Sequence, residues 1–256
     1  MMLNEATLSK LRNMKLQAIG DAFNEQLTGK LYEQMPFEER FGILVDLEWT
    51  RRENNRLGRL IKNAGFPIRN ASLEDLDFTT RNIDRNLIAS LSACNYIFDR
   101  RNVLLLGPTG GGKTFLATAL GTAAVRKKLA VKYYRMPDLL TELAIAHEEG
   151  THRKLIKQLA KIPLLILDEW LLFPLTVNEA RDIFDLVEYR KDFGAVIICS
   201  QFEVKGWHPK IGEDCAADAI CDRISARSTT IRLEPIESMR RTIAKRDAAQ
   251  EADGNT

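Results

Sequence analysis

The chain has 256 residues, of which 45% are hydrophobic and 28% charged, and its formal net charge is +2. This length and composition are typical of a globular protein with one α/β domain and a small additional piece, and the charge is too small to imply a nucleic-acid partner by itself. No apolar run approaches the ~20 residues of a membrane span, and the first residues lack the basic-then-apolar plan of a signal peptide. We therefore expect a cytoplasmic protein that does not associate with membranes.

The first 70 or so residues contain no strand pattern and form a predicted helical domain, residues 1–70. Apolar residues recur at three- and four-residue spacing from Leu8 to Phe23, which predicts one amphipathic helix ending near Gly29. Pro36 suits the opening of a second helix, whose pattern continues without a breaker to Gly65.

The second helix carries a basic face in its C-terminal half. At 100° per residue, its five cations fall within an arc of about 140°, and the opposite side, which would pack, carries Leu57, Leu60 and Ile61. They are Arg51, Arg52, Arg56, Arg59 and Lys62. A row of cations fits a row of DNA phosphates, so these residues are candidate DNA-binding residues; the alternative is an ordinary solvated helix surface.

After a polar linker at 68–82 and a short helix at 87–98, apolar strands alternate with helices. The predicted strands are 103–106, 130–135, 164–167, 195–199 and 229–233, with helices expected at 115–128, 138–149 and 152–161. This alternation predicts an α/β fold with a five-stranded parallel sheet and helices on both faces, over residues 71–248. A last helix at 238–248 and a disordered tail at 249–256 complete the expectation.

The loop after the first strand reads Gly-Pro-Thr-Gly-Gly-Gly-Lys-Thr and satisfies the phosphate-loop pattern G-x-x-x-x-G-K-[ST]. Its glycines allow positive φ and a close approach of backbone amides to an anion, and the following helix points its positive end at the same place. Lys113 would bind the β- and γ-phosphates, and Thr114 would bind Mg²⁺. We expect ATP contacts from Gly107, Pro108, Thr109, Gly110, Gly111, Gly112, Lys113, Thr114 and Phe115.

The third strand ends in two acids, Asp168 and Glu169. A buried strand here would deliver Asp168 to Mg²⁺ beside the phosphates, and Glu169 could polarise a water for attack on the γ-phosphate. The acid pair favours an ATPase over a GTPase or a small-molecule kinase, and no Asn-Lys-x-Asp guanine motif is present.

Three further polar residues are candidates for catalysis. Gln201, after the fourth strand, could orient the attacking water or could simply face solvent. Arg223 could reach a neighbouring subunit's γ-phosphate or could be a surface arginine. Arg240, with Arg241 as its competitor, could reach back to the phosphates from the last helix.

The four cysteines and three histidines show no metal-binding spacing. Cys94, Cys199, Cys215 and Cys221 form no C-x-x-C pair, and His147, His152 and His208 are scattered along the sequence. We therefore expect no zinc site, and reduced thiols of which two or more pack in the core.

These motifs, with Cys-Ser-Gln at 199–201, Ala-Asp-Ala-Ile-Cys-Asp-Arg at 217–223 and Glu-Ser-Met-Arg at 237–240, occur in an order that resembles the IstB-type transposition helper ATPases. These are relatives of the helicase loader DnaC within the AAA+ initiator clade. The segment from Arg51 to Pro67 is also similar to that family, so the resemblance extends roughly from Leu8 to Arg241.

The resemblance implies an AAA+ ATPase core, with Arg223 as the trans-acting arginine and Arg240 as the second sensor. It implies a protein that binds double-stranded DNA, forms a homo-oligomer promoted by ATP, and presents target DNA to its cognate transposase. A DnaC-like replicative helicase loader is the alternative. A stand-alone kinase is a third possibility, but a kinase needs an acceptor-binding segment, and the sequence offers Arg223 instead.

Overall fold

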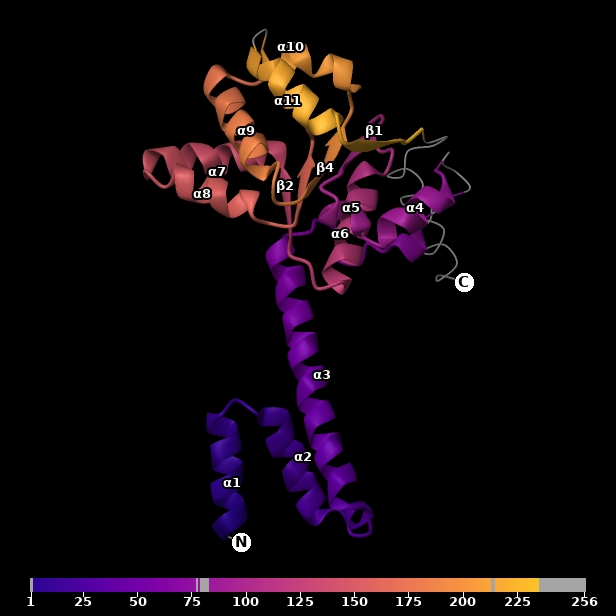
Figure 1. The fold of residues 1–256 in the computed structure, drawn as a ribbon, viewed down its shortest axis with the longest axis vertical. Coiled ribbons are helices and arrows are strands. Elements are labelled where there is room, and N and C mark those ends of the chain that lie inside the picture. The colour runs from indigo at the N-terminus through magenta and orange to yellow at the C-terminus, as the bar shows by residue number, and fades with distance from the viewer. Residues whose placement is uncertain (1, 77, 79–82, 213–214, 235–256) are drawn as a thin grey trace, which may run out of the picture. The chain divides into compact units, whose positions relative to one another are not determined.

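A computed structural model describes residues 2–76, 78, 83–212 and 215–234 (Figure 1). The chain divides into two compact units, Met1–Arg59 and Leu60–Thr256. The predicted last helix at 238–248, the predicted tail at 249–256 and Arg240 lie outside the described residues.

The N-terminal unit is helical, as expected, but the single helix predicted up to Gly29 is wrong. The chain forms α1 (Met2–Asn13) and α2 (Gln17–Thr28), and Lys15 between them has a φ of 59°. The amide of Lys15 donates to the Arg12 carbonyl and that of Leu16 to the Leu11 carbonyl, which is the hydrogen-bond pattern of a Schellman motif. Periodicity alone misses this break because a lysine, rather than a glycine, occupies the left-handed position.

The start of α2 depends on a residue far along the chain. The amide of Ala18 donates to Oε2 of Glu48 at 3.0 Å, so a buried carboxylate satisfies one of the unpaired amides of the first turn. Glu48 lies on α3 (Phe37–Ala64), which follows a 3-10 helix at Lys30–Tyr32 and confirms the predicted second helix. Local sequence could not reveal this capping contact.

The C-terminal unit contains a five-stranded sheet in the order β2-β3-β4-β1-β5, with every pair parallel. The strands are β1 (Asn102–Leu106), β2 (Val131–Arg135), β3 (Leu164–Asp168), β4 (Ala195–Ser200) and β5 (Ser228–Arg232). Each lies within two residues of its predicted range. The central strands β3 and β4 are buried throughout, which explains why they are almost wholly apolar.

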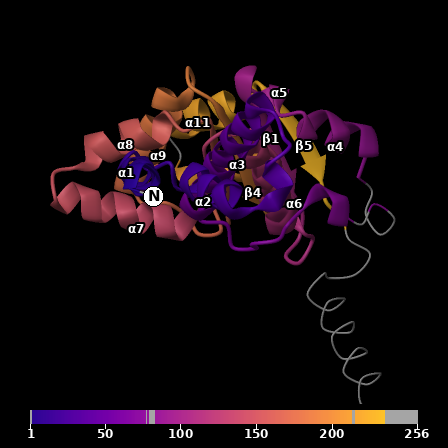
Figure 2. The ribbon, with the colours of Figure 1, turned by 90° about the horizontal axis from the view of Figure 1, so that it is seen from below.

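Helices cover both faces of the sheet, confirming the predicted fold class. On one side are α4 (Arg85–Ser92), α5 (Asn95–Phe98) and α6 (Lys113–Arg126); on the other are α7 (Met136–Glu148), α8 (His152–Ala160) and α9 (Val177–Arg190), as Figure 1 shows. Figure 2 shows α7, α8 and α9 grouped away from α4 and α6. The short helix α10 (His208–Ile211) leads to α11 (Cys215–Ser225), which packs against α9.

The single helix predicted at 87–98 is also wrong, because Cys94 adopts a φ of 64° and separates α4 from α5. Alternate side chains of the strands enter different cores: Leu165 and Leu167 of β3 join the cluster beneath α7, α8, α9 and α11. Ile166, which lies between these two leucines in β3, points to the other face of the sheet and contacts Gly121 of α6. None of the described helices has the length and hydropathy needed to cross a membrane.

Candidate nucleotide-binding site

The loop between β1 and α6 has the backbone that the phosphate-loop pattern requires. Gly107, Gly110 and Gly112 have φ values of 147°, 79° and 87°. A Cβ on Gly107 would lie 2.3 Å from the carbonyl oxygen of Leu233, so only glycine fits there. Gly111 does not use the positive φ that glycine allows, and its amide donates to the Pro108 carbonyl at 3.1 Å in a turn.

Helix α6 begins directly at the end of this loop. The amide of Leu116 donates to the Gly112 carbonyl at 2.9 Å, and helix geometry leaves the amides of the preceding turn without intrahelical acceptors. These amides belong to Lys113, Thr114 and Phe115, all of which are predicted nucleotide contacts. An anion such as a phosphate is the natural acceptor at this position.

Lys113 places its charge over the same loop. Its Nζ donates to the carbonyls of Gly107 and Pro108 at 2.7 and 2.8 Å, and the residue is buried. Burial lowers the pKa of Lys113, and the nearby Asp168 opposes this shift. The ammonium is thus held by carbonyl oxygens of the loop itself, which are partners that a triphosphate could replace.

Asp168, at the end of β3, is the centre of a hydrogen-bonded cluster. The hydroxyl of Thr114 donates to its Oδ2 at 2.6 Å, and that of Tyr133 donates to the same oxygen at 2.7 Å. The amide of Glu169 donates to Oδ1 at 2.8 Å. The structure therefore brings together Thr114 and Asp168, the two predicted metal ligands, although 54 residues separate them. Their hard oxygens fit Mg²⁺.

Tyr133 was not predicted to belong to the site. Burial raises the pKa of its hydroxyl, and the negative charge of Asp168 adds to the shift, so Tyr133 remains a hydrogen-bond donor at neutral pH. The residue comes from β2, whose register with β3 sets Tyr133 beside Ile166 and Arg135 beside Asp168.

Glu169 has a φ of 56° and is held by a second residue that was not predicted, Arg135. The Arg135 guanidinium contacts Oε2 of Glu169 through Nη2 at 2.8 Å and Nε at 3.2 Å. This hydrogen bond to Glu169 raises the pKa of Arg135. The candidate base is therefore tied to an arginine at the end of the neighbouring strand.

Gln201 follows β4, and β4 lies between β3 and β1 in the sheet. The exposed Gln201 therefore lies just after the strand that separates the strands of the phosphate loop and the acid pair, and its proposed role in orienting water stays a prediction. The preceding Ser200 is buried and has a structural role: its hydroxyl accepts from the Trp207 indole and donates to the Trp170 carbonyl.

Arg223 lies on α11 and is paired within its own chain. Its Nε is 2.6 Å from Oε2 of Glu188 on α9, and its guanidinium lies 5.1 Å from the centre of the Phe184 ring. Lys191 also bonds to Glu188, and this bond is the main reason why the pKa of Glu188 is lowered. A trans role for Arg223, which stays a prediction, would require this partly exposed side chain to leave Glu188.

The predicted basic face on α3 is divided by the structure into two groups. Arg51 and Arg52 both bind Oε1 of Glu48, at 2.9 and 2.8 Å. The hydrogen bond from Arg51 is the largest cause that lowers the pKa of Glu48, to about 2. The other three cations are exposed: Arg56, Arg59 and Lys62.

Two of the histidines that are scattered in the sequence are adjacent in the fold. His147 and His152 stack with ring centres 3.7 Å apart, and both rings lie beside the carboxylate of Asp182. All four cysteines are free, and Cys94 and Cys199 are buried.

Comparison with known proteins places these features in a family. A family model described as IstB-like ATP binding protein matches residues 9–248. The chain belongs to this family. A Pseudomonas fluorescens protein named for ATP binding in insertion sequence IS1162 is 40% identical over 201 residues, which cover 78% of this chain and 87% of that relative. An insertion-sequence ATP-binding protein of Sinorhizobium fredii is 36% identical over 241 residues, covering 94% and 98%.

Solved structures agree with the fold of this IstB-like family member. The DnaC helicase loader aligns with a TM-score of 0.52 at 20% identity, covering 64% of this chain and 97% of the loader. AMPPCP-bound DnaA from Aquifex aeolicus aligns with a TM-score of 0.57 at 17% identity, covering 71% and 55%. The chain is thus an ATP-binding protein with the AAA+ fold.

Proposed function

We propose that this protein is a Mg²⁺-dependent ATPase that assembles on double-stranded DNA and assists a transposase in insertion-sequence transposition. The observation that carries the ATPase part is the cluster of Lys113, Thr114, Asp168 and Glu169 at one edge of the sheet. When bound, Mg²⁺ would neutralise charge on the phosphates, and Thr114 and Asp168 are the residues that would hold it.

In this proposal Glu169 is the general base for hydrolysis. Its carboxylate would accept a proton from the attacking water, which requires an oxygen that is not occupied by another strong donor. Arg135 occupies Oε2 of Glu169 in the described conformation. The Arg135–Glu169 pair would therefore restrain the orientation of the base, and breaking the pair would leave both carboxylate oxygens available to water.

Arg135→Ala is expected to retain ATP binding and to raise basal phosphate release. The side chains of Arg135 and Glu169 are 51% and 33% exposed, and pairs exposed to water contribute only about 0.2–1 kcal/mol, so the increase should not exceed about fivefold. Steady-state phosphate release without DNA measures the effect, with Arg126→Ala as a control because Arg126 pairs with Glu74 elsewhere. Lower turnover at unchanged ATP affinity would show that Arg135 assists catalysis instead.

The proposed active site is shared between subunits of a homo-oligomer promoted by ATP. Arg223 is a partly exposed arginine whose carboxylate partner, Glu188, lies on a neighbouring helix rather than in the nucleotide site. If a second subunit presented its phosphates to this surface, Arg223 could exchange Glu188 for the γ-phosphate. Gln201, and Arg240 in the part of the chain that is not described, are proposed as sensors of the same phosphate.

The proposed DNA contact is the part of the basic face on α3 that is not paired with Glu48. Arg56, Arg59 and Lys62 are free of Glu48, whereas Arg51 and Arg52 are partly neutralised by it. Phosphates would be bound without base reading, because cations on one helix face position the duplex and carry no sequence information. The proposed N-terminal domain, residues 1–70, would thus provide DNA binding and assembly, and residues 71–248 the ATPase.

The role in transposition rests on the relatives, which are named as insertion-sequence ATP-binding proteins and match most of the chain. A replicative helicase loader is the second candidate, favoured by the fold shared with DnaC. The exposed cations of α3 favour DNA as the ligand. Reading the neighbouring open reading frame separates the two roles: a transposase gene supports the proposal, and a replicative helicase gene contradicts it.

Replacing Arg56, Arg59 and Lys62 with alanine is expected to weaken duplex binding equally for all sequences. Each phosphate contact contributes about −0.9 to the slope of log K against log[salt], so the slope should flatten by up to about 2.7. A salt titration of duplex binding with ATP present measures this slope. The control replaces Arg153, Lys154 and Lys157, three exposed cations of α8, and should keep the parental slope. The opposite pattern would place the DNA along α8.

A further inference from the structure

The turn between α7 and α8 brings two imidazole rings together. Gly150 has a φ of 67°, its amide donates to the His147 carbonyl at 3.0 Å, and the amide of Thr151 donates to the Ala146 carbonyl at 2.8 Å. This Schellman pattern reverses the chain within three residues. It sets His147, in the last turn of α7, against His152, the first residue of α8, with ring planes 17° apart.

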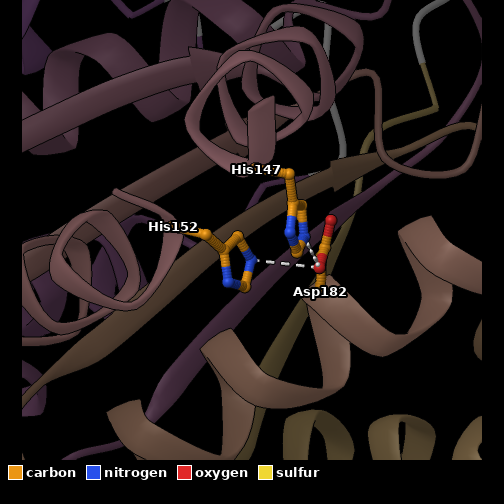
Figure 3. A group of neighbouring side chains, drawn as sticks. All are labelled: His147, His152 and Asp182. Atoms are coloured by element: carbon orange, nitrogen blue, oxygen red, sulfur yellow. Dashed lines mark hydrogen bonds and ion pairs between the residues drawn. The ribbon is translucent and has the colours of Figure 1, made fainter. Parts of the chain in front are cut away.

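Both rings place a nitrogen close to the same carboxylate (Figure 3). Nε2 of His147 lies 2.9 Å from Oδ1 of Asp182, and Nε2 of His152 lies 3.0 Å from the same oxygen. Asp182 is buried on α9, so the three side chains come from three different helices. A buried carboxylate whose neighbours are two imidazoles is a donor set of the kind that binds transition metals.

The direction of His152 distinguishes this cluster from a simple hydrogen-bonded triad. Its Nε2 is buried and has no hydrogen-bond partner, although Oδ1 of Asp182 is within hydrogen-bond distance. The lone pair or proton on this nitrogen therefore points beside the oxygen rather than at it. Buried polar atoms without a partner are costly, and a shared cation is one way to satisfy this nitrogen.

The spacing of the donor atoms is close to that of a metal site. Ligand atoms of the three residues lie within 4.8 Å of one another. Zinc bonds of about 2.0–2.2 Å separate neighbouring donor atoms by about 3–3.5 Å, so modest side-chain rotations would complete the geometry. The His147 side chain is 50% exposed, which leaves room for water as a further ligand, whereas His152 and Asp182 are 14% and 11% exposed.

We propose that His147, His152 and Asp182 form a binding site for a divalent transition-metal ion such as Zn²⁺. The site shares no residue with the nucleotide loop or its acid pair. Bound metal would cross-link the α7–α8 turn to α9, the helix that also carries the Arg223 partner Glu188. Its expected effect is to stabilise this part of the fold, because a ligand that binds only the folded state raises stability.

Metal binding to the full chain, stripped with a chelator and free of nucleotide, tests the proposal. We would use a Cys215→Ser parent, because Cys215 is exposed and could bind metal on its own. The parent is expected to bind one equivalent of Zn²⁺ and to show a higher Tm with Zn²⁺. Co²⁺ should give visible d–d bands without the thiolate charge-transfer band, since no cysteine is a ligand.

His152→Ala and Asp182→Asn are expected to lower Zn²⁺ affinity by at least about 100-fold and to remove the Tm increase, because loss of a ligand exceeds the 10–100-fold cost of losing an outer-shell partner. His208→Ala is the matched control, since His208 forms an exposed pair with Asp218 at 3.0 Å. If circular dichroism shows that a variant is unfolded, the half-exposed His147→Ala replaces it. No saturable Zn²⁺ binding by the parent, or equal binding by parent and variants, would overturn the proposal.

Discussion

Lys113→Ala is expected to reduce ATP affinity by at least about 100-fold. The Lys113 ammonium would bind the β- and γ-phosphates, and each charge-assisted hydrogen bond contributes about 1.5–3 kcal/mol, so the loss is about 3 kcal/mol or more. Titration with a fluorescent ATP analogue measures the affinity. Lys127→Ala, at the other end of α6, is the control and should bind ATP like the parent.

Glu169→Gln completes this prediction, because it should keep ATP binding and lose hydrolysis. Thr114 and Asp168 would still hold Mg²⁺, whereas the amide cannot accept the proton of the attacking water, and loss of a general base costs about 10²–10⁴ in rate. Phosphate release measures turnover. Normal turnover by Glu169→Gln, or tight ATP binding by Lys113→Ala, would contradict the roles assigned to these side chains.

Arg223→Ala is expected to bind ATP but to hydrolyse it about 10³–10⁵ times more slowly, the effect of removing a trans-acting arginine. Lys113→Ala should also be inactive alone. Mixing the two variants should restore part of the activity, because some interfaces would then pair an intact phosphate loop with an intact Arg223. Phosphate release from mixtures at varied ratios measures this rescue.

Glu188→Gln separates the trans role of Arg223 from a structural one. If Arg223 serves only to pair with Glu188 in its own chain, removing either partner should impair the protein equally. If Arg223 acts on a neighbour's phosphate, Glu188→Gln should keep turnover, since the arginine is released rather than lost. Absence of rescue in mixed oligomers, together with equal damage by both substitutions, would refute the shared site.

The phosphate loop could be predicted from sequence because its chemistry is local. Gly107 to Thr114 are consecutive, and a buried strand before them and a helix after them fix where the loop opens. Asp168 could be placed for a related reason: parallel strands carry their carboxyl ends to one edge of the sheet. The fold class followed from the alternation of apolar strands and helices.

The residues that hold Asp168 and Glu169 could not be predicted, because they depend on strand order. Tyr133 and Arg135 become neighbours of the acids only through the pairing of β2 with β3, and neither follows a motif. The helix breaks at Lys15 and Cys94 could not be predicted either, because neither residue is a glycine or a proline. The pair His147 and His152 was missed because its spacing fits no helix face and depends on the turn at Gly150.

Duplex binding by Glu169→Gln, compared with and without ATP, tests the central claim most directly. This variant should retain ATP in an assembled state, so that many copies of the α3 cations contact one duplex and increase the affinity through multivalency. The account predicts that ATP tightens DNA binding by Glu169→Gln and has no effect on Lys113→Ala. Equal DNA affinity of both variants with and without ATP would contradict an ATP-dependent DNA-binding assembly.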